Sequence, residues 1–271
     1  DFYSCFPIAV SNITDALGFM AYAPAEQEIL IKANTTDTIL RRISLYALSQ
    51  IGGAASQSIL ADAAKSARYV YDPTEATAAY INYLHKRIAN GEAVPAGKAA
   101  LKLFKETDED SQVHTHIAAL GLLTEINKEK QVNVLLKASR DGNPVYRNAA
   151  LGLLSPYLNG TVSTKLVKRL SKVDEQIQVD ILRYVANHKQ TEALPEVQKA
   201  LSASTPSVRI AAVNALHQLD AEAADEALIV LLSGSDEQTR QAVKQALLTS
   251  KNKQLAQLLT NALTNERNAD V

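Results

Sequence analysis

Two segments of this chain are nearly identical and lie 31 residues apart. His116–Leu123 reads HIAALGLL and Arg147–Leu154 reads RNAALGLL. Further steps of 31 reach Gln178, Arg209 and Arg240, each with an apolar residue three positions on and another seven positions on. These spacings place the apolar residues on one stripe of a helix. A strict pitch of this length predicts an array of repeated helical units.

Weaker copies of the pattern extend toward the N-terminus. They begin at Ile13, Arg41 and Thr77, which gives eight anchors in all. The expected buried stripes of these three copies are Ala16 with Met20, Ser44 with Leu48, and Tyr80 with Leu84.

Capping residues agree with this periodicity. Good N-cap residues stand four positions before five of the anchors, and proline follows two of them, at the first helical position. The expected caps are Asp37, Asn143, Asp174, Thr205 and Asp236, with Pro144 and Pro206 after the second and fourth.

Each unit also contains a second apolar segment, about one helix further on. Nineteen residues past six of the anchors stand Leu60, Leu135, Leu166, Val197, Leu228 and Leu259. A helix pair this small cannot bury its apolar stripe alone, so neighbouring pairs must stack to form a continuous core.

The segment Thr205–Leu216, TPSVRIAAVNAL, resembles the first helix of HEAT repeats, especially the short variety named after phycobilisome lyases. The resemblance covers most of residues 8–264. It implies an all-α fold, a right-handed α-α superhelix (HEAT-like solenoid) of about eight two-helix repeats. We expect one domain over residues 1–271, with irregular units at 8–107 and regular 31-residue units at 108–264.

The arginine typical of the family's first helix is present in only some units. It stands at Arg41, Arg147, Arg209 and Arg240, and is replaced by Thr77, His116 and Gln178. A charged ladder along the stack is therefore expected to be interrupted.

Composition excludes several classes of protein. With 28 basic and 29 acidic residues the net charge is −1, and there is no Trp, so we expect no nucleic-acid partner. The single cysteine, Cys5, excludes an intrachain disulfide and a cysteine-rich zinc site. No apolar run approaches the ~20 residues that span a bilayer. The start at Asp1 leaves room for a removed targeting segment, so the exported and cytoplasmic compartments both stay open, as does the oligomeric state.

Spacing between anchors is longer around two expected inserts, Ser66–Glu75 and Ala89–Ala96. Four tyrosines, Tyr69, Tyr71, Tyr80 and Tyr83, fall within fifteen residues around the first. Inserts in solenoids map to loops on one face, so Tyr69 and Tyr71 are candidates for binding a partner. The favoured interpretation is packing, with Tyr80 and Tyr83 filling the long unit and the other two covering its end.

A second candidate surface is basic. Lys165, Lys168 and Arg169 are expected on one face of the second helix Val162–Leu170, where they could meet an anionic partner. A solvated helix face is the favoured interpretation.

The sequence offers no catalytic, cofactor-binding or metal-ligating motif. His114 and His116 are two residues apart and would point in different directions on a helix. HEAT-repeat enzymes of the deoxyhypusine hydroxylase type bind di-iron through His-Glu pairs, and no His-Glu dipeptide occurs here. Cys5, beside Phe2 and Phe6, is expected to be an apolar plug of the end cap.

We therefore expect a non-catalytic scaffold whose second helices present a concave surface to a protein partner or an adjacent domain. The chain is also weakly similar to helical regions that precede a sugar-degrading β-sandwich domain in some bacterial proteins, which implies a glycan-processing neighbour. The alternative is an enzyme with a site in the groove, of the lyase or DNA-glycosylase type.

Overall fold

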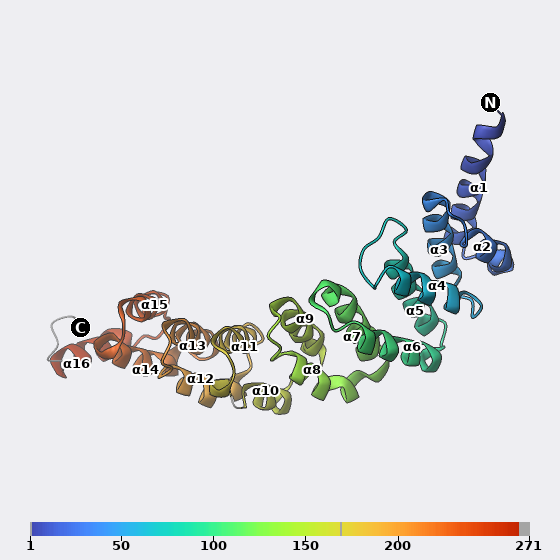
Figure 1. The fold of residues 1–271 in the computed structure, drawn as a ribbon. Coiled ribbons are helices and arrows are strands. Elements are labelled where there is room, and N and C mark those ends of the chain that lie inside the picture. The colour runs from blue at the N-terminus through green and yellow to red at the C-terminus, as the bar shows by residue number, and fades with distance from the viewer. Residues whose placement is uncertain (1, 169, 266–271) are drawn as a thin grey trace. The chain divides into compact units, whose positions relative to one another are not determined.

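The structure is a computed structural model. It describes the backbone of residues 2–168 and 170–265, and the side chains of residues 9–168, 170–220 and 224–264. Throughout these ranges the regular elements are helices, without strands. The expectations for Phe2, Cys5, Phe6 and Arg169 concern side chains outside the described residues. The helices group into two compact units, Asp1–Gln131 and Val132–Val271 (Figure 1). A single domain over the whole chain stays a prediction.

Unit 1 contains four first helices and three second helices. Both α1 and α5 pack on α3, α4 packs on α5, and α6 packs on α7. The first helices are α1 (Phe2–Phe19), α3 (Thr38–Ile51), α5 (Ala76–Ala89) and α7 (Val113–Asn127). The second helices are α2 (Glu26–Lys32), α4 (Ser56–Ser66) and α6 (Ala93–Glu106), and the 3-10 turns are η1 (Ala23–Ala25), η2 (Asp110–Gln112) and η3 (Lys128–Gln131).

In unit 2 the first helices α11, α13 and α15 lie along one side, and α10, α12 and α14 lie along the other (Figure 1). The first helices are α9 (Pro144–Leu154), α11 (Glu175–Asn187), α13 (Pro206–Leu219) and α15 (Glu237–Leu248). The second helices are α8 (Val132–Ala138), α10 (Gly160–Val167), α12 (Leu194–Ala200), α14 (Ala221–Gly234) and α16 (Leu255–Asn265). The 3-10 turns are η4 (Ser155–Tyr157), η5 (Leu170–Lys172) and η6 (Thr191–Ala193).

The 31-residue pitch is confirmed in the helix starts. Helices α7, α9, α11, α13 and α15 begin at Val113, Pro144, Glu175, Pro206 and Glu237, each 31 residues after the one before. The expected stripe residues of these helices are buried, and so are the second-helix residues from Leu60 to Leu228. Leu259 is 37% exposed because it lies in α16, after which the structure describes no further helix.

Three of the five expected caps form side-chain hydrogen bonds. Asp37 accepts from the amides of Ile39 and Leu40, Asn143 from those of Val145 and Tyr146, and Asp236 from that of Thr239. Asp174 and Thr205 occupy the N-cap position without such a bond. Helix starts were therefore predicted correctly, but the mode of capping differs between units.

The register of the first helix was predicted wrongly. Ala16 is exposed and Met20 is 70% exposed, whereas Thr14 and Gly18 are buried. A Cβ at Gly18 would lie 2.5 Å from the Cα of Ala47, so α1 and α3 approach backbone to backbone here. This close contact, and not the apolar stripe, sets how α1 faces its neighbour.

The second expected insert, Ala89–Ala96, is shorter than predicted. Only Asn90–Glu92 lie outside helices, and Pro95 stands in the first turn of α6. Gly91 has a φ of +86°, which glycine adopts without strain. The extra length of this unit lies in α5 and α6, which have 14 residues each.

The anchor residue closes the turn that precedes its own helix. In five units its side chain donates a hydrogen bond to a backbone carbonyl five to seven residues earlier. The pairs are Thr77 with Val70, Arg147 with Asp141, Gln178 with Val173, Arg209 with Ala203, and Arg240 with Ser235. Thr77 and Gln178 carry no charge, so the charged ladder is interrupted at these two units, as expected. Their side chains nevertheless donate the same kind of hydrogen bond that arginine donates in the other units.

Candidate interaction sites

The loop between α4 and α5 is anchored from within unit 1. Tyr69 is 8% exposed, and its hydroxyl donates to Oε2 of Glu106 at 2.5 Å. Burial, and then the hydrogen bond to this carboxylate, raise the pKa of Tyr69 well above its usual value. Thr115 Oγ1 donates to the carbonyl of Tyr69 at 2.6 Å, and Gln112 Nε2 donates to that of Arg68 at 2.9 Å. The loop is thereby tied to α6, η2 and α7.

The end of the same loop is fixed by Asp72. Its carboxylate accepts from the hydroxyl of Thr74 at 2.5 Å and from the amides of Thr74 and Ala76 at 3.1 and 3.0 Å. Partial burial raises the pKa of Asp72, but these hydrogen bonds outweigh it, and the pKa lies below its usual value. The loop therefore enters α5 in one defined conformation.

Of the two tyrosines in this anchored loop, Tyr71 is the exposed one, because its side chain is 83% exposed. It borders a pocket of about 300 Å³ in unit 1, formed by the loop, α5 and α7. The pocket surface is mostly apolar, and Val70, Ala78, Ile81 and His114 line it together with Tyr71. A rigid loop thus presents a tyrosine beside an apolar hollow.

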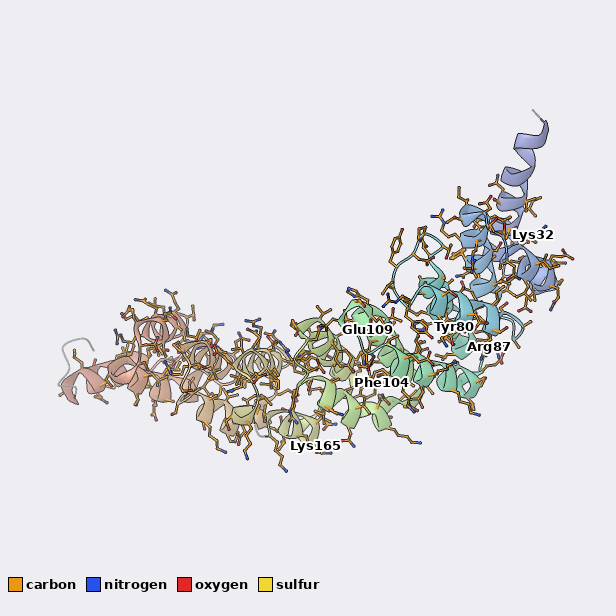
Figure 2. All side chains as sticks on the ribbon, viewed as in Figure 1. Lys32, Tyr80, Arg87, Phe104, Glu109 and Lys165 are labelled. Atoms are coloured by element: carbon orange, nitrogen blue, oxygen red, sulfur yellow. The ribbon has the colours of Figure 1, made fainter. Side chains whose placement is uncertain are left out.

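The tyrosine cluster divides into buried and exposed members. Tyr80 and Tyr83 are buried in the core of unit 1, as the packing interpretation predicts. Figure 2 labels Tyr80. Tyr69 belongs with them, since its ring is buried and its hydroxyl is bound, so it offers no ring to a partner. Only Tyr71 keeps the exposure that a contact residue needs.

The basic candidate surface lies on α10 in unit 2, where Figure 2 labels Lys165. Lys165 and Lys168 are exposed, and neither forms an ion pair among the described residues. The expected helix Val162–Leu170 is too long, because α10 ends at Val167 and Lys168 turns away with a ψ of 126°. Lys168 therefore does not continue the helical face of Lys165.

Arg140, which sequence reasoning missed, lies at the end of α10. Its guanidinium donates to the carbonyls of Lys165, Leu166 and Lys168 at 2.8, 2.9 and 3.1 Å. A cation at a helix C-terminus compensates the carbonyl dipoles there. The positive charge of Arg140 is thus already used in holding the helix end.

Three of the histidines lie against neighbouring side chains. His116 stacks on Phe104 with ring centroids 4.1 Å apart, and His85 lies 3.1 Å from a carboxylate oxygen of Glu125. His217 lies 3.1 Å from the hydroxyl of Thr249. Among the described residues, no three His, Cys, Asp or Glu side chains are placed to share a metal ion.

A serine and a histidine meet at the end of α9. Ser155 Oγ lies 3.2 Å from Nε2 of His188, whose Nδ1 lies 2.9 Å from the carbonyl of Tyr184. This pairing is that of an activated nucleophile. Ser155, however, is the C-cap of α9, where the helix presents carbonyl oxygens, and an oxyanion needs amide donors instead. The geometry therefore favours a structural hydrogen bond.

One family of known proteins matches part of the chain. Residues 163–248 match the family model of HEAT repeats, so the chain carries HEAT repeats over this stretch, within an all-α array of helix pairs. None of its described helices is long and apolar enough to cross a membrane. The subtype named after phycobilisome lyases stays a resemblance.

No curated protein matches the chain. Among solved structures, an engineered protein is 18% identical with a TM-score of 0.39, over 93% of this chain and 77% of the other. Human deoxyhypusine hydroxylase in complex with glycerol is 15% identical with a TM-score of 0.39, over 94% of this chain and 98% of the other. Likeness at this level says nothing about activity. HEAT repeats form a scaffold that is commonly used for protein interaction.

Proposed function

We propose that the chain is a protein-interaction module, without catalytic activity of its own, that binds a partner at the pocket beside Tyr71. The observation that carries this proposal is the contrast within one loop: Tyr69 and Asp72 are held by hydrogen bonds, while Tyr71 is 83% exposed. Exposing a large aromatic ring to water has no benefit for the fold. A rigid tyrosine beside an apolar pocket is typical of binding hot spots.

The occupant that fits is an apolar side chain of a protein partner. The pocket holds about 300 Å³, at the lower end of ligand pockets, and its surface is mostly apolar. Glu75, which also lines it, is paired with Arg42 at 3.8 Å, so the surroundings favour no highly charged ligand. An aliphatic or aromatic side chain on a peptide would bury the Tyr71 ring and the faces of Ala78 and Ile81.

The place of this pocket differs from the surface expected from the sequence. We expected the second helices to contact the partner. The pocket is formed instead by the loop that carries Tyr71 and by the first helices α5 and α7. The partner is either a separate protein or a domain of the same polypeptide. A glycan-processing neighbour stays a prediction, which the complete gene product would test.

Panning a displayed peptide library on the purified chain tests the proposal. Enriched peptides should share a large apolar residue, and Tyr71→Ala should weaken their binding about tenfold or more, the loss of one hot-spot residue. Ala78→Phe should block the pocket. Tyr22→Ala is the matched control, since Tyr22 is an exposed tyrosine outside the pocket, and it should bind normally.

Failure to enrich any peptide, or equal binding by the Tyr71 and Tyr22 variants, would refute the proposal. The enzymatic alternative predicts a different result, namely turnover of a small molecule that persists in Tyr71→Ala.

A further inference from the structure

A second pocket, of about 310 Å³, lies on the first-helix side of unit 2 between α9 and α11. Polar and apolar atoms contribute about equally to its surface, unlike that of the mostly apolar pocket beside Tyr71. The two helices are joined here by side chains, through Arg147 with Asp180 and through Ser155 with Tyr184 and His188. Nothing in the repeat pattern requires an open polar space at this one junction.

A glycine creates the space. Gly152 lines the pocket, and a Cβ built on it would meet nothing within 4 Å. Its counterpart 31 residues further on is Arg183, which lies on the opposite wall. One repeat therefore lacks a side chain where the next one carries a guanidinium.

The charge of the pocket is positive. Asp180 lines it, but one oxygen of this carboxylate accepts two hydrogen bonds from Arg147, at 2.8 and 2.6 Å, and the other accepts from Gln176 at 3.1 Å. Arg183 is exposed and has no hydrogen bond or ion pair within the described part of the chain. One guanidinium thus remains uncompensated, in a site whose acid is already neutralised.

The side of the pocket formed by Ser155, Tyr184 and His188 is held by hydrogen bonds. The carbonyl of Tyr184 only accepts, so Nδ1 of His188 donates to it, while Nε2 lies 3.2 Å from Ser155 Oγ. The hydroxyl of Tyr184 lies 3.0 Å from the same Oγ. This chain of bonds orients the rings of Tyr184 and His188, whose centroids lie 4.2 Å apart. Such fixed walls lower the entropic cost of binding a ligand.

From these observations we propose that the pocket between α9 and α11 binds a carboxylate group. Arg183 supplies the planar fork that matches a carboxylate, and the exposed amides of Asn148 and Asn187 supply further donors. A single uncompensated cation suits a singly charged group. A phosphate carries nearly twice that charge and would meet the Asp180 carboxylate on the same surface.

The carboxylate has two sources, a small acid or an acidic side chain of a protein, and the two are distinguishable. This site goes beyond the proposed function, because it shares no residue with the pocket beside Tyr71. Isothermal titration of the whole chain with glutarate tests the small acid. Titration with a short peptide whose only acidic group is one glutamate side chain tests the other source, and inorganic phosphate tests the anion class.

The expected result is millimolar or tighter binding of at least one carboxylate and weaker binding of phosphate. Arg183→Gln and Gly152→Leu should each reduce that affinity at least tenfold. The matched control is Gly121→Leu, because Gly121 is the equivalent glycine one repeat earlier, also with nothing within 4 Å of its Cβ position. Gly121→Leu should leave the binding unchanged.

Gly152→Ala adds a single methyl group and keeps the test valid if the leucine variant does not fold. Three results would overturn the proposal. The first is that neither carboxylate binds. The second is that Arg183→Gln binds the carboxylate as well as the wild type does. The third is that phosphate binds as tightly as the carboxylate.

Discussion

The guanidinium of Arg147 donates two hydrogen bonds to a single carboxylate oxygen of Asp180, from its Nε at 2.8 Å and from a terminal nitrogen at 2.6 Å. The third contact of the same side chain runs back to the carbonyl of Asp141 at 2.7 Å. Arg147 is 1% exposed. One residue therefore closes the turn before α9 and joins α9 to α11.

Replacing Arg147 by alanine should destabilise unit 2 by about 3–5 kcal/mol, because Asp180, whose side chain is only 9% exposed, would lose the guanidinium that neutralises its charge. Urea unfolding at neutral pH measures the change. Lys199→Ala is the control, since the lysine is 70% exposed in its pair with Glu196, and loss of that pair should cost about 0–1 kcal/mol. Equal costs for the two variants would contradict the assigned role of Arg147.

The helix caps give a prediction that rests on hydrogen bonds to uncharged side chains. Asn143→Ala removes the acceptor of two backbone amides and should destabilise the protein by about 1 kcal/mol. Thr205→Ala, at the same position two repeats later, removes a side chain that makes no cap hydrogen bond and should cost less than about 0.5 kcal/mol. Thermal and urea unfolding of both variants would show the difference, and a reversed order would refute it.

Four of the five regular first helices, α9, α11, α13 and α15, could be predicted because two independent signals coincide in them, whereas α7 was found from the pitch alone. The 31-residue pitch places the buried stripe, and the residues Asn143 and Asp236 fix where helices begin. The first helix had only the stripe, and it was assigned the wrong face. The contact that decides its register, Gly18 against Ala47, joins two residues that no sequence pattern links.

The candidate sites could be predicted only in part from the sequence, for a similar reason. Anchor spacing located the loop that carries Tyr69 and Tyr71, but not which ring points outward. Arg68 and Tyr69 both adopt positive φ, at 56° and 58°, a local reversal that hydrogen bonds from distant residues maintain. The pocket of Arg183 did leave a signal, a glycine at Gly152 where the next repeat has arginine. Its meaning appears only when the two helices are side by side.

Acid should weaken unit 2 through Asp236. Hydrogen bonds from the Thr239 hydroxyl, from Arg209 and from the Thr239 amide hold the pKa of this carboxyl well below its usual value. A depressed folded-state pKa adds stability that is complete above the unfolded value of about 3.9 and is lost as the pH falls toward the folded one. Asp236→Asn keeps an N-cap acceptor but removes the charge.

The stability difference between wild type and Asp236→Asn should therefore be largest near neutral pH and should shrink below about pH 4. Urea midpoints at a series of pH values measure it. A difference that stays constant down to about pH 2 would show that the charge of Asp236 is not what stabilises the helix start.

Alkali should act on unit 1 through Tyr80. Burial, followed by the nearby Tyr83 and Glu106, raises the pKa of Tyr80 to about 12. Because the unfolded chain releases this proton near 10, the contribution of Tyr80 to stability is complete below about pH 10 and is lost as the pH rises through about 12. Tyr80→Phe cannot ionise at this position, so the variant should unfold at a higher pH than the wild type.

Circular dichroism, recorded together with tyrosinate absorbance, follows both the unfolding and the ionisation. Tyr46→Phe, at a more exposed tyrosine of α3, should leave the midpoint where it is. If Tyr80→Phe unfolds at the wild-type pH, then ionisation of this ring does not drive the transition.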